Sequence, residues 1–66
     1  MELSGREIDV LRLTAVGHSN KTIAATLMIG VKTVDTYKAR AMVKLGFQNR
    51  VDVVRYALSK GWLNEV

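Results

Sequence analysis

Hydrophobic residues recur along this chain at intervals of three and four, the spacing of one face of an α-helix. Four segments follow this rule, and glycines and polar capping residues separate them. Sustained alternation of apolar and polar residues, which would indicate β-strands, does not occur in the sequence. The pattern therefore predicts an all-α fold: a compact domain of four helices.

Capping signals place the helix ends. Ser4 and Glu7 have the spacing of a capping box, and Leu3 and Ile8 have the spacing of a hydrophobic staple, so the first helix should begin at Ser4. Gly17 should end it, because glycine takes the left-handed cap conformation at little cost. Similar signals place the other helices at about residues 20–28, 31–45 and 50–60, with Ser19 and Asn49 as N-caps and Gly46 and Gly61 as stops.

The same periodicity predicts which side of each helix is buried. The expected inward rows are Ile8, Leu11 and Ala15, widened by Val10; Ile23 and Leu27; Val34, Tyr37, Ala41 and Leu45; and Val51, Val54 and Leu58. The fourth helix also carries an apolar arc of Val53, Tyr56 and Ala57. Two interpretations of this arc stay open: an exposed strip that serves as a partner site, or a surface covered by Trp62 and Leu63.

The stretch NKTIAATLMIGVKTVDTYKAR, residues 20–40, reads as two short amphipathic helices joined by a tight turn at Ile29 and Gly30. Apolar residues fall where two steeply crossed helices must touch, and Ala24 lies where they approach most closely. This is the pattern of a helix-turn-helix, whose second helix enters the DNA major groove.

At about 100° per residue, the helix at residues 31–45 has a second, outer face. It carries Lys32, Asp35, Thr36, Ala39, Arg40 and Val43. Arginine can bond guanine with two hydrogen bonds, a carboxylate can accept one from cytosine, and a methyl group can meet the thymine methyl. An ordinary solvated helix face would look similar; the preceding helix and turn favour base reading.

Composition narrows the class of protein. The chain has 66 residues, enough for one small core, and is 48% hydrophobic, which argues against disorder. It has no cysteine, no membrane-spanning apolar run and no signal-peptide pattern, which fits a cytoplasmic protein without membrane contact. The formal net charge of +4 suits a polyanionic partner. Neither a catalytic constellation nor a metal-ligand spacing is visible, so we expect no enzyme, metal or cofactor.

At this point the sequence resembles a known family: the LuxR-type, also called NarL/FixJ- or GerE-type, DNA-binding domain of bacterial transcription regulators. The resemblance is carried in order by LSGREIDVLRL, GHSNKTIAATLMI, VKTVDTYKARAMVKLG and NRVDVVRYAL, which span nearly the whole chain. It implies one helix-turn-helix effector domain over residues 1–66, the output end of a regulator whose input domain is not in this sequence. It also implies a third helix that reads the major groove and a fourth that mediates dimerisation.

Transferred by position, the family's base contacts fall on Asp35, Thr36 and Ala39, with Arg40 alongside. Its phosphate contacts fall on Asn20, Lys21, Lys32, Thr33 and Lys44. The resemblance further implies a homodimer on an inverted-repeat site of double-stranded DNA, with Val53, Tyr56 and Ala57 at the dimer interface, and it allows RNA polymerase as a partner. The sequence departs from the family at two positions. Gly30 stands where a small polar N-cap residue is common, and Asp35 stands where a basic residue is common.

Two other classes compete with DNA binding. A sigma-factor-like or other helical protein-interaction module would show an apolar or acidic outer face on the third helix, whereas this face is basic. A purely structural dimerisation module would not need Lys21, Lys32, Thr33 and Arg40 to converge on one side.

Overall fold

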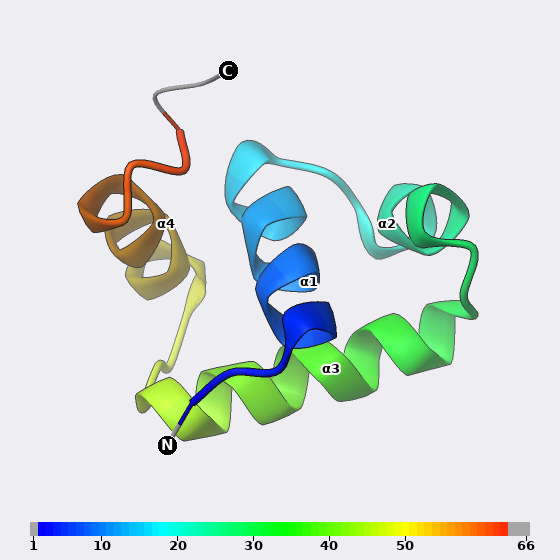
Figure 1. Cartoon of the computed structure of the whole chain (residues 1–66), viewed down its shortest axis with the longest axis horizontal. Coiled ribbons are helices and arrows are strands. Elements are labelled where there is room, and N and C mark those ends of the chain that lie inside the picture. The colour runs from blue at the N-terminus through cyan, green and yellow to red at the C-terminus, as the bar shows by residue number, and fades with distance from the viewer. Residues whose placement is uncertain (1, 64–66) are drawn as a thin grey trace.

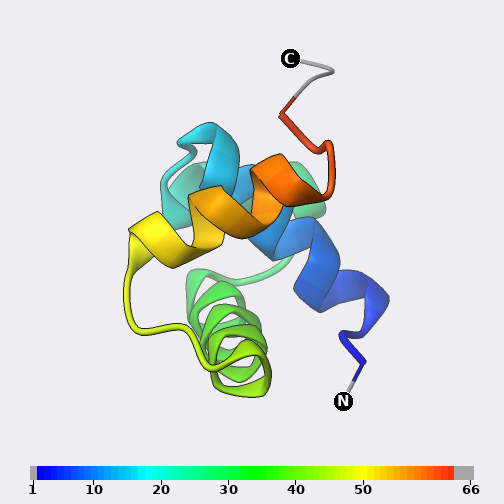
Figure 2. The ribbon, with the colours of Figure 1, turned by 90° about the vertical axis from the view of Figure 1, so that its left-hand side faces the viewer.

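The computed structural model describes residues 2–63 and consists of α1 (Gly5–Val16), α2 (Asn20–Leu27), α3 (Val31–Leu45) and α4 (Arg50–Ser59). No strand occurs within these residues, and the predicted all-α, four-helix fold is confirmed. The helix α3 runs along one side, with α2 over its N-terminal end, α1 across its middle and α4 beside its C-terminal end (Figure 1). Seen from the side, α3 points toward the viewer while α4 crosses above it (Figure 2).

The helix ends follow the predicted caps. The Ser4 hydroxyl accepts from the Glu7 N–H at 3.2 Å, and the Glu7 carboxylate accepts from the Ser4 N–H at 2.8 Å, which completes the capping box. Ser19 and Asn49 cap α2 and α4 in the same manner, with their side chains accepting from backbone N–H groups three residues on. Side-chain caps therefore mark the starts of α1, α2 and α4, whereas Gly30 at the start of α3 makes no such hydrogen bond.

The core consists of two clusters on two different sides of α1. One contains Val10 with Ile23, Ala24 and Val34, and so joins α1 to α2 and to the first turns of α3. The other contains Leu11 with Ala41 and Val53, and joins α1 to the later turns of α3 and to α4. Because Val10 and Leu11 are neighbours with no exposed surface, α1 is covered on both sides and is the central helix of the domain.

The helix α4 is rotated relative to the predicted orientation. Val53 and Ala57, expected in the flanking arc, are 1% and 0% exposed, whereas Val51 and Leu58, expected in the core, are each 56% exposed. The predicted inward row is therefore wrong at Val51 and Leu58. The alternative of an exposed strip at Val53, Tyr56 and Ala57 is wrong too: Val53 and Ala57 are buried and Tyr56 is half-buried, so these residues belong to the domain itself.

Residues 61 and 62 turn back over α4 and cover its buried side. Gly61 has a positive φ of 74° and turns the backbone so that the Trp62 N–H donates to the Ala57 carbonyl at 3.0 Å. Trp62 then packs on the Val53 cluster, and its ring meets Tyr56 edge-to-face at 5.4 Å between centroids. The second interpretation of the arc, coverage by Trp62, is therefore the one that the structure adopts.

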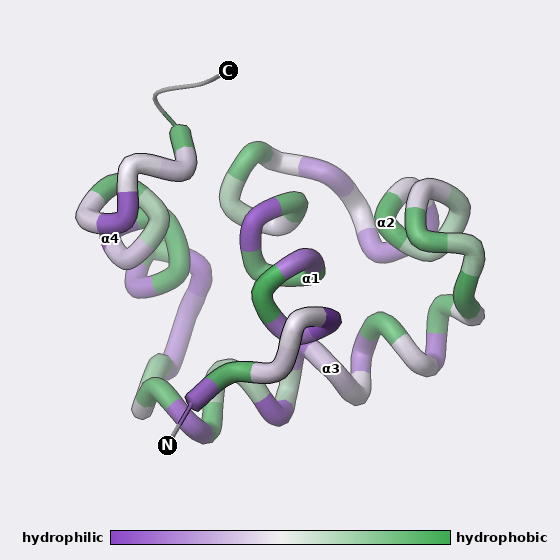
Figure 3. The backbone as a smooth tube through the Cα atoms, viewed as in Figure 1, coloured by the Kyte–Doolittle hydropathy of each residue, from purple (hydrophilic) through white to green (hydrophobic). Residues whose placement is uncertain are grey.

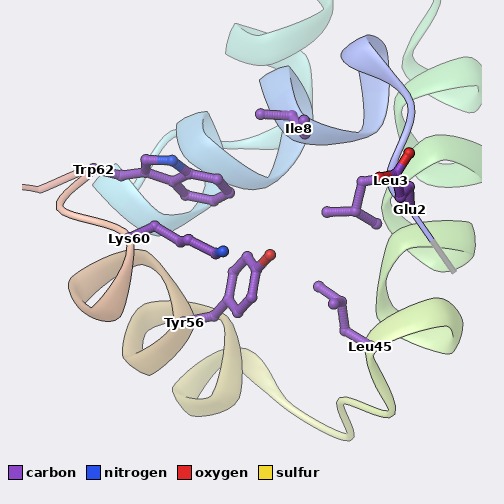
Figure 4. A pocket seen from close by; sticks show the side chains of 7 residues that line it. All are labelled: Glu2, Leu3, Ile8, Leu45, Tyr56, Lys60 and Trp62. Carbon is purple, nitrogen blue, oxygen red and sulfur yellow. The ribbon is translucent and has the colours of Figure 1, made fainter.

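An open hollow of about 450 Å³ remains at this end of the core, between the start of α1 and the ends of α3 and α4. Figure 4 shows the side chains around it: Glu2, Leu3, Ile8, Leu45, Tyr56, Lys60 and Trp62. The staple residues Leu3 and Ile8 both border this space, so the second cluster is closed less completely than the first.

A matched pair of substitutions on α4 tests its rotation. Val53→Ala should lower the free energy of unfolding by about 1.5–3 kcal/mol, because it removes fully buried methyl groups and leaves a cavity. Val51→Ala, the same change on the exposed side, should alter it by no more than about 0.5 kcal/mol. Urea unfolding followed by circular dichroism measures both, and the reverse order of effects would restore the inward row of Val51, Val54 and Leu58.

Candidate nucleic-acid interface

The outer face of α3 is free of packing. All six side chains assigned to it from the sequence are exposed: Lys32, Asp35, Thr36, Ala39, Arg40 and Val43. Hydrophobic and hydrophilic positions alternate along the tube of α3 in Figure 3, as expected for a helix that buries a single face. Val43 keeps 80% of its surface exposed, so even an apolar member of this face makes little contact within the domain.

The turn before α3 holds this helix at a steep angle to α2. The chain leaves α2 at Met28, which has a left-handed φ of 58° although it is not glycine. The Ile29 N–H then donates to the Ala24 carbonyl at 3.0 Å, and the Ile29 side chain packs on the first core cluster. Gly30 caps α3 in an extended conformation with φ −74°, so the turn takes its left-handed residue from methionine and not from the neighbouring glycine. A non-glycine residue in this region costs about 1–2 kcal/mol.

Asn20 links the two helices of the motif. Its side-chain Nδ2 donates to Asp35 Oδ1 at 2.5 Å, and Lys38 Nζ donates to its Oδ1 at 2.6 Å. One amide at the first turn of α2 thus contacts two residues one turn apart on α3. The predicted phosphate role of Asn20 is untested, but its side chain has two partners within the domain.

The other predicted phosphate contacts divide into two groups. Lys21 on α2 and Lys32 and Thr33 on the first turn of α3 are exposed. Lys44 is different, because its Nζ donates to Glu7 Oε1 at 2.7 Å and lies 3.4 Å from the Glu2 carbonyl oxygen. This ammonium group therefore neutralises a carboxylate of the domain, which leaves less of its charge for a phosphate.

Glu7 is the buried carboxylate of this pair, with 2% of its surface exposed. The hydrogen bond from Lys44 and then that from the Ser4 N–H hold the pKa of Glu7 below its ordinary value of 4.5, against the opposing effect of burial. The folded state thus favours the ionised form. It gains stability from this carboxylate above about pH 4.5 and loses that contribution as the pH falls through the lowered pKa.

Glu7→Gln should make the domain less stable at pH 7, because Lys44 loses its charged partner. The difference in unfolding free energy between Glu7→Gln and the unmodified chain should shrink as the pH falls from about 4.5 through the lowered pKa of the folded state, because Glu7 is protonated in both states only below that lowered pKa. Urea titrations at pH 7, 5, 4 and 3 measure it. Glu2→Gln, which removes a nearby exposed carboxylate, is the matched control and should change stability by no more than about 0.5 kcal/mol. A pH-independent difference would exclude the ion pair as its cause.

Two basic residues that the sequence analysis did not single out lie near the start of α2. Lys38 contacts Asn20, and Arg50 donates from Nη2 to the Thr14 carbonyl at 3.1 Å, on the last turn of α1. Both border a hollow of about 440 Å³ together with His18. A cation at a helix C-terminus is favourable, so Arg50 acts as a cap supplied by another helix. The only signal for Lys38 in the sequence was its position one helical turn after Asp35.

No group of three or more His, Cys, Asp or Glu side chains among residues 2–63 could hold a metal ion. No helix in this part of the chain is both long and apolar enough to cross a membrane. The helix pair α2 and α3 presents one exposed, mainly polar face, the outer face of α3.

This geometry defines a helix-turn-helix domain, and comparison with known proteins identifies its family. Residues 1–57 match the family "Bacterial regulatory proteins, luxR family". The chain is 47% identical over 58 residues to the oxygen regulatory protein NreC of Staphylococcus aureus, in strains JH9, JH1 and Mu3. That alignment covers 88% of this chain and 27% of NreC, so the chain spans about a quarter of the length of these relatives. No solved structure gave a significant match.

The chain therefore belongs to the LuxR family of bacterial regulatory proteins. It is a helix-turn-helix domain of the DNA-binding kind found in transcription regulators, and the resemblance seen in the sequence is confirmed.

Proposed function

We propose that this domain binds double-stranded DNA sequence-specifically, with α3 in the major groove. The observation that carries the proposal is the outer face of α3, where Asp35, Thr36, Ala39 and Arg40 are all exposed. Arg40 has the chemistry to bond guanine, Asp35 to accept from the cytosine amino group, and Thr36 and Ala39 to meet a thymine methyl. We propose that Lys21, Lys32 and Thr33, which are all exposed, contact the phosphates that flank the groove.

We further propose that the domain is the output part of a longer regulator and acts as a dimer on an inverted repeat. Two copies related by a two-fold axis would place their α3 helices in successive major grooves, about 34–36 Å apart. The burial of Val53 and Ala57 moves the candidate dimer contact to the opposite side of α4, where Val51, Arg55 and Leu58 are exposed. So small a surface would not hold a dimer together without DNA.

Salt dependence tests the phosphate contacts. The affinity for a duplex selected from a random pool should fall with salt, with a log–log slope of about −0.9 for each contacted phosphate. Lys21→Ala should weaken binding to all sequences alike and make the slope shallower by about one. Lys60→Ala, at the far end of α4, is the matched control and should change neither quantity. A flat salt response in fluorescence-anisotropy titrations would exclude DNA binding through these cations.

Cooperativity between half-sites tests the dimer contact. Leu58→Lys puts a charge on the exposed side of α4 and should reduce the cooperativity, obtained by comparing full-site with half-site binding, by about tenfold or more. Binding to a single half-site should persist, because Leu58 does not support the core. Val16→Lys, an equivalent change at an exposed position of α1, should leave the cooperativity unaltered. If Leu58→Lys weakens both targets to the same degree, or the full site shows no cooperativity at all, α4 is not the dimer contact.

A further inference from the structure

The amide of Asn20 has a single orientation available to it. Lys38 Nζ is purely a donor, so the atom that faces it at 2.6 Å must be the amide oxygen. The amide nitrogen then faces the Asp35 carboxylate, which is purely an acceptor, at 2.5 Å. Both partners come from α3, and one can only donate while the other can only accept. If the amide were reversed, its nitrogen would face the Lys38 ammonium and its oxygen would face the Asp35 carboxylate, so both hydrogen bonds would be lost.

The hydrogen bond with Asn20 gives the two carboxylate oxygens of Asp35 different roles. Oδ1 accepts from Asn20, and the carboxylate has a second oxygen that can accept from a ligand. We propose that Asn20 is a positioning residue for base reading: it holds the exposed carboxylate of Asp35 so that the second oxygen meets the exocyclic amino group of a base, with cytosine as the preferred partner. The inference rests on the proposed function, since it assigns a role within the same DNA interface.

A held carboxylate differs physically from a free one at this location. An exposed aspartate can rotate, and DNA phosphates repel it, so ordering it on binding would cost free energy. The Asn20 amide supplies the order before DNA arrives, and the ammonium of Lys38 on the other side of that amide places a positive charge near the site. The acidic residue that departs from the family pattern thus becomes a prepared acceptor.

This role also differs from a direct phosphate contact by Asn20. A phosphate contact would contribute equally to every DNA sequence, whereas positioning of Asp35 would affect preference at one base pair. Total affinity therefore does not distinguish the two roles, and base preference does.

The test uses the 66-residue chain and duplexes that it selects from a random pool. The base pair whose preference is lost in Asp35→Ala is identified first, and four duplexes that differ only there form the panel. Asn20→Ala should reduce discrimination within this panel by about twofold to tenfold, the cost of ordering a side chain on binding. In the Asp35→Ala background it should have no further effect on discrimination, because the residue it positions is gone.

Lys21→Ala is the matched control on the same turn of α2. It should weaken all four duplexes alike and leave their ranking unaltered, and circular dichroism should show that each variant keeps its helices. If Asn20→Ala discriminates as well as the unmodified chain, or weakens all four duplexes equally, positioning is excluded while sequence-specific binding stands. If Asp35→Ala alters the preference at no base pair, positioning is excluded as well. If selection yields no preferred sequence at all, the proposed function itself fails.

Discussion

The double burial of α1 is the constraint on which the rest of this domain depends. Val10 and Leu11 are adjacent, and each is fully buried in a different cluster. One helix of twelve residues must therefore be covered on two sides by the other three. Of the three helices that cover α1, α3 contributes buried residues to both clusters: Val34 near its start and Ala41 in its later turns. These core contacts occupy one face of α3, and the opposite face is exposed to solvent.

The positive charge of the chain is distributed between structural and external roles. Lys44 pairs with the buried Glu7, Arg50 caps the end of α1, and Lys38 contacts Asn20. These cations hold α1, α2, α3 and α4 together through polar contacts between helices. Lys21, Lys32 and Arg40 are exposed, and these are the cations that the proposed DNA contacts would use. The formal charge of +4 alone does not reveal this division, because it counts all cations equally.

The contact of Asn20 with Asp35 and Lys38 connects the packing of the helices with the proposed DNA recognition. Apolar packing at Ile23, Ala24 and Val34 sets the crossing of α2 over α3. That crossing brings the Asn20 amide to two consecutive turns of α3, so the same geometry that builds the motif also brings Asn20 into contact with Asp35 on the outer face of α3. A change in the α2–α3 packing would accordingly be expected to reach base preference through this amide.

The sequence by itself determined the helices and their ends, because these depend on neighbours three or four residues away. The capping box at Ser4, the side-chain caps at Ser19 and Asn49, and the bounds of α3 could all be predicted from such spacings. The outer face of α3 was predictable for a related reason. Most residues of that face are polar, whereas the opposite face of α3 carries apolar residues, so helical periodicity distinguishes the two faces.

Only the tertiary structure decided the rotation of α4, the partners of Asn20 and the use of Lys44. Both sides of α4 carry aliphatic residues, so hydrophobicity could not choose between them. The side of α4 that is buried is the one whose shape fits the core. The small Ala57 faces the interior there, and Trp62 turns back at Gly61 to cover Val53. Asn20 and Lys44 make contacts to residues 15 to 42 positions away in the sequence. Such contacts exist only once the helices are packed, and no local spacing encodes them.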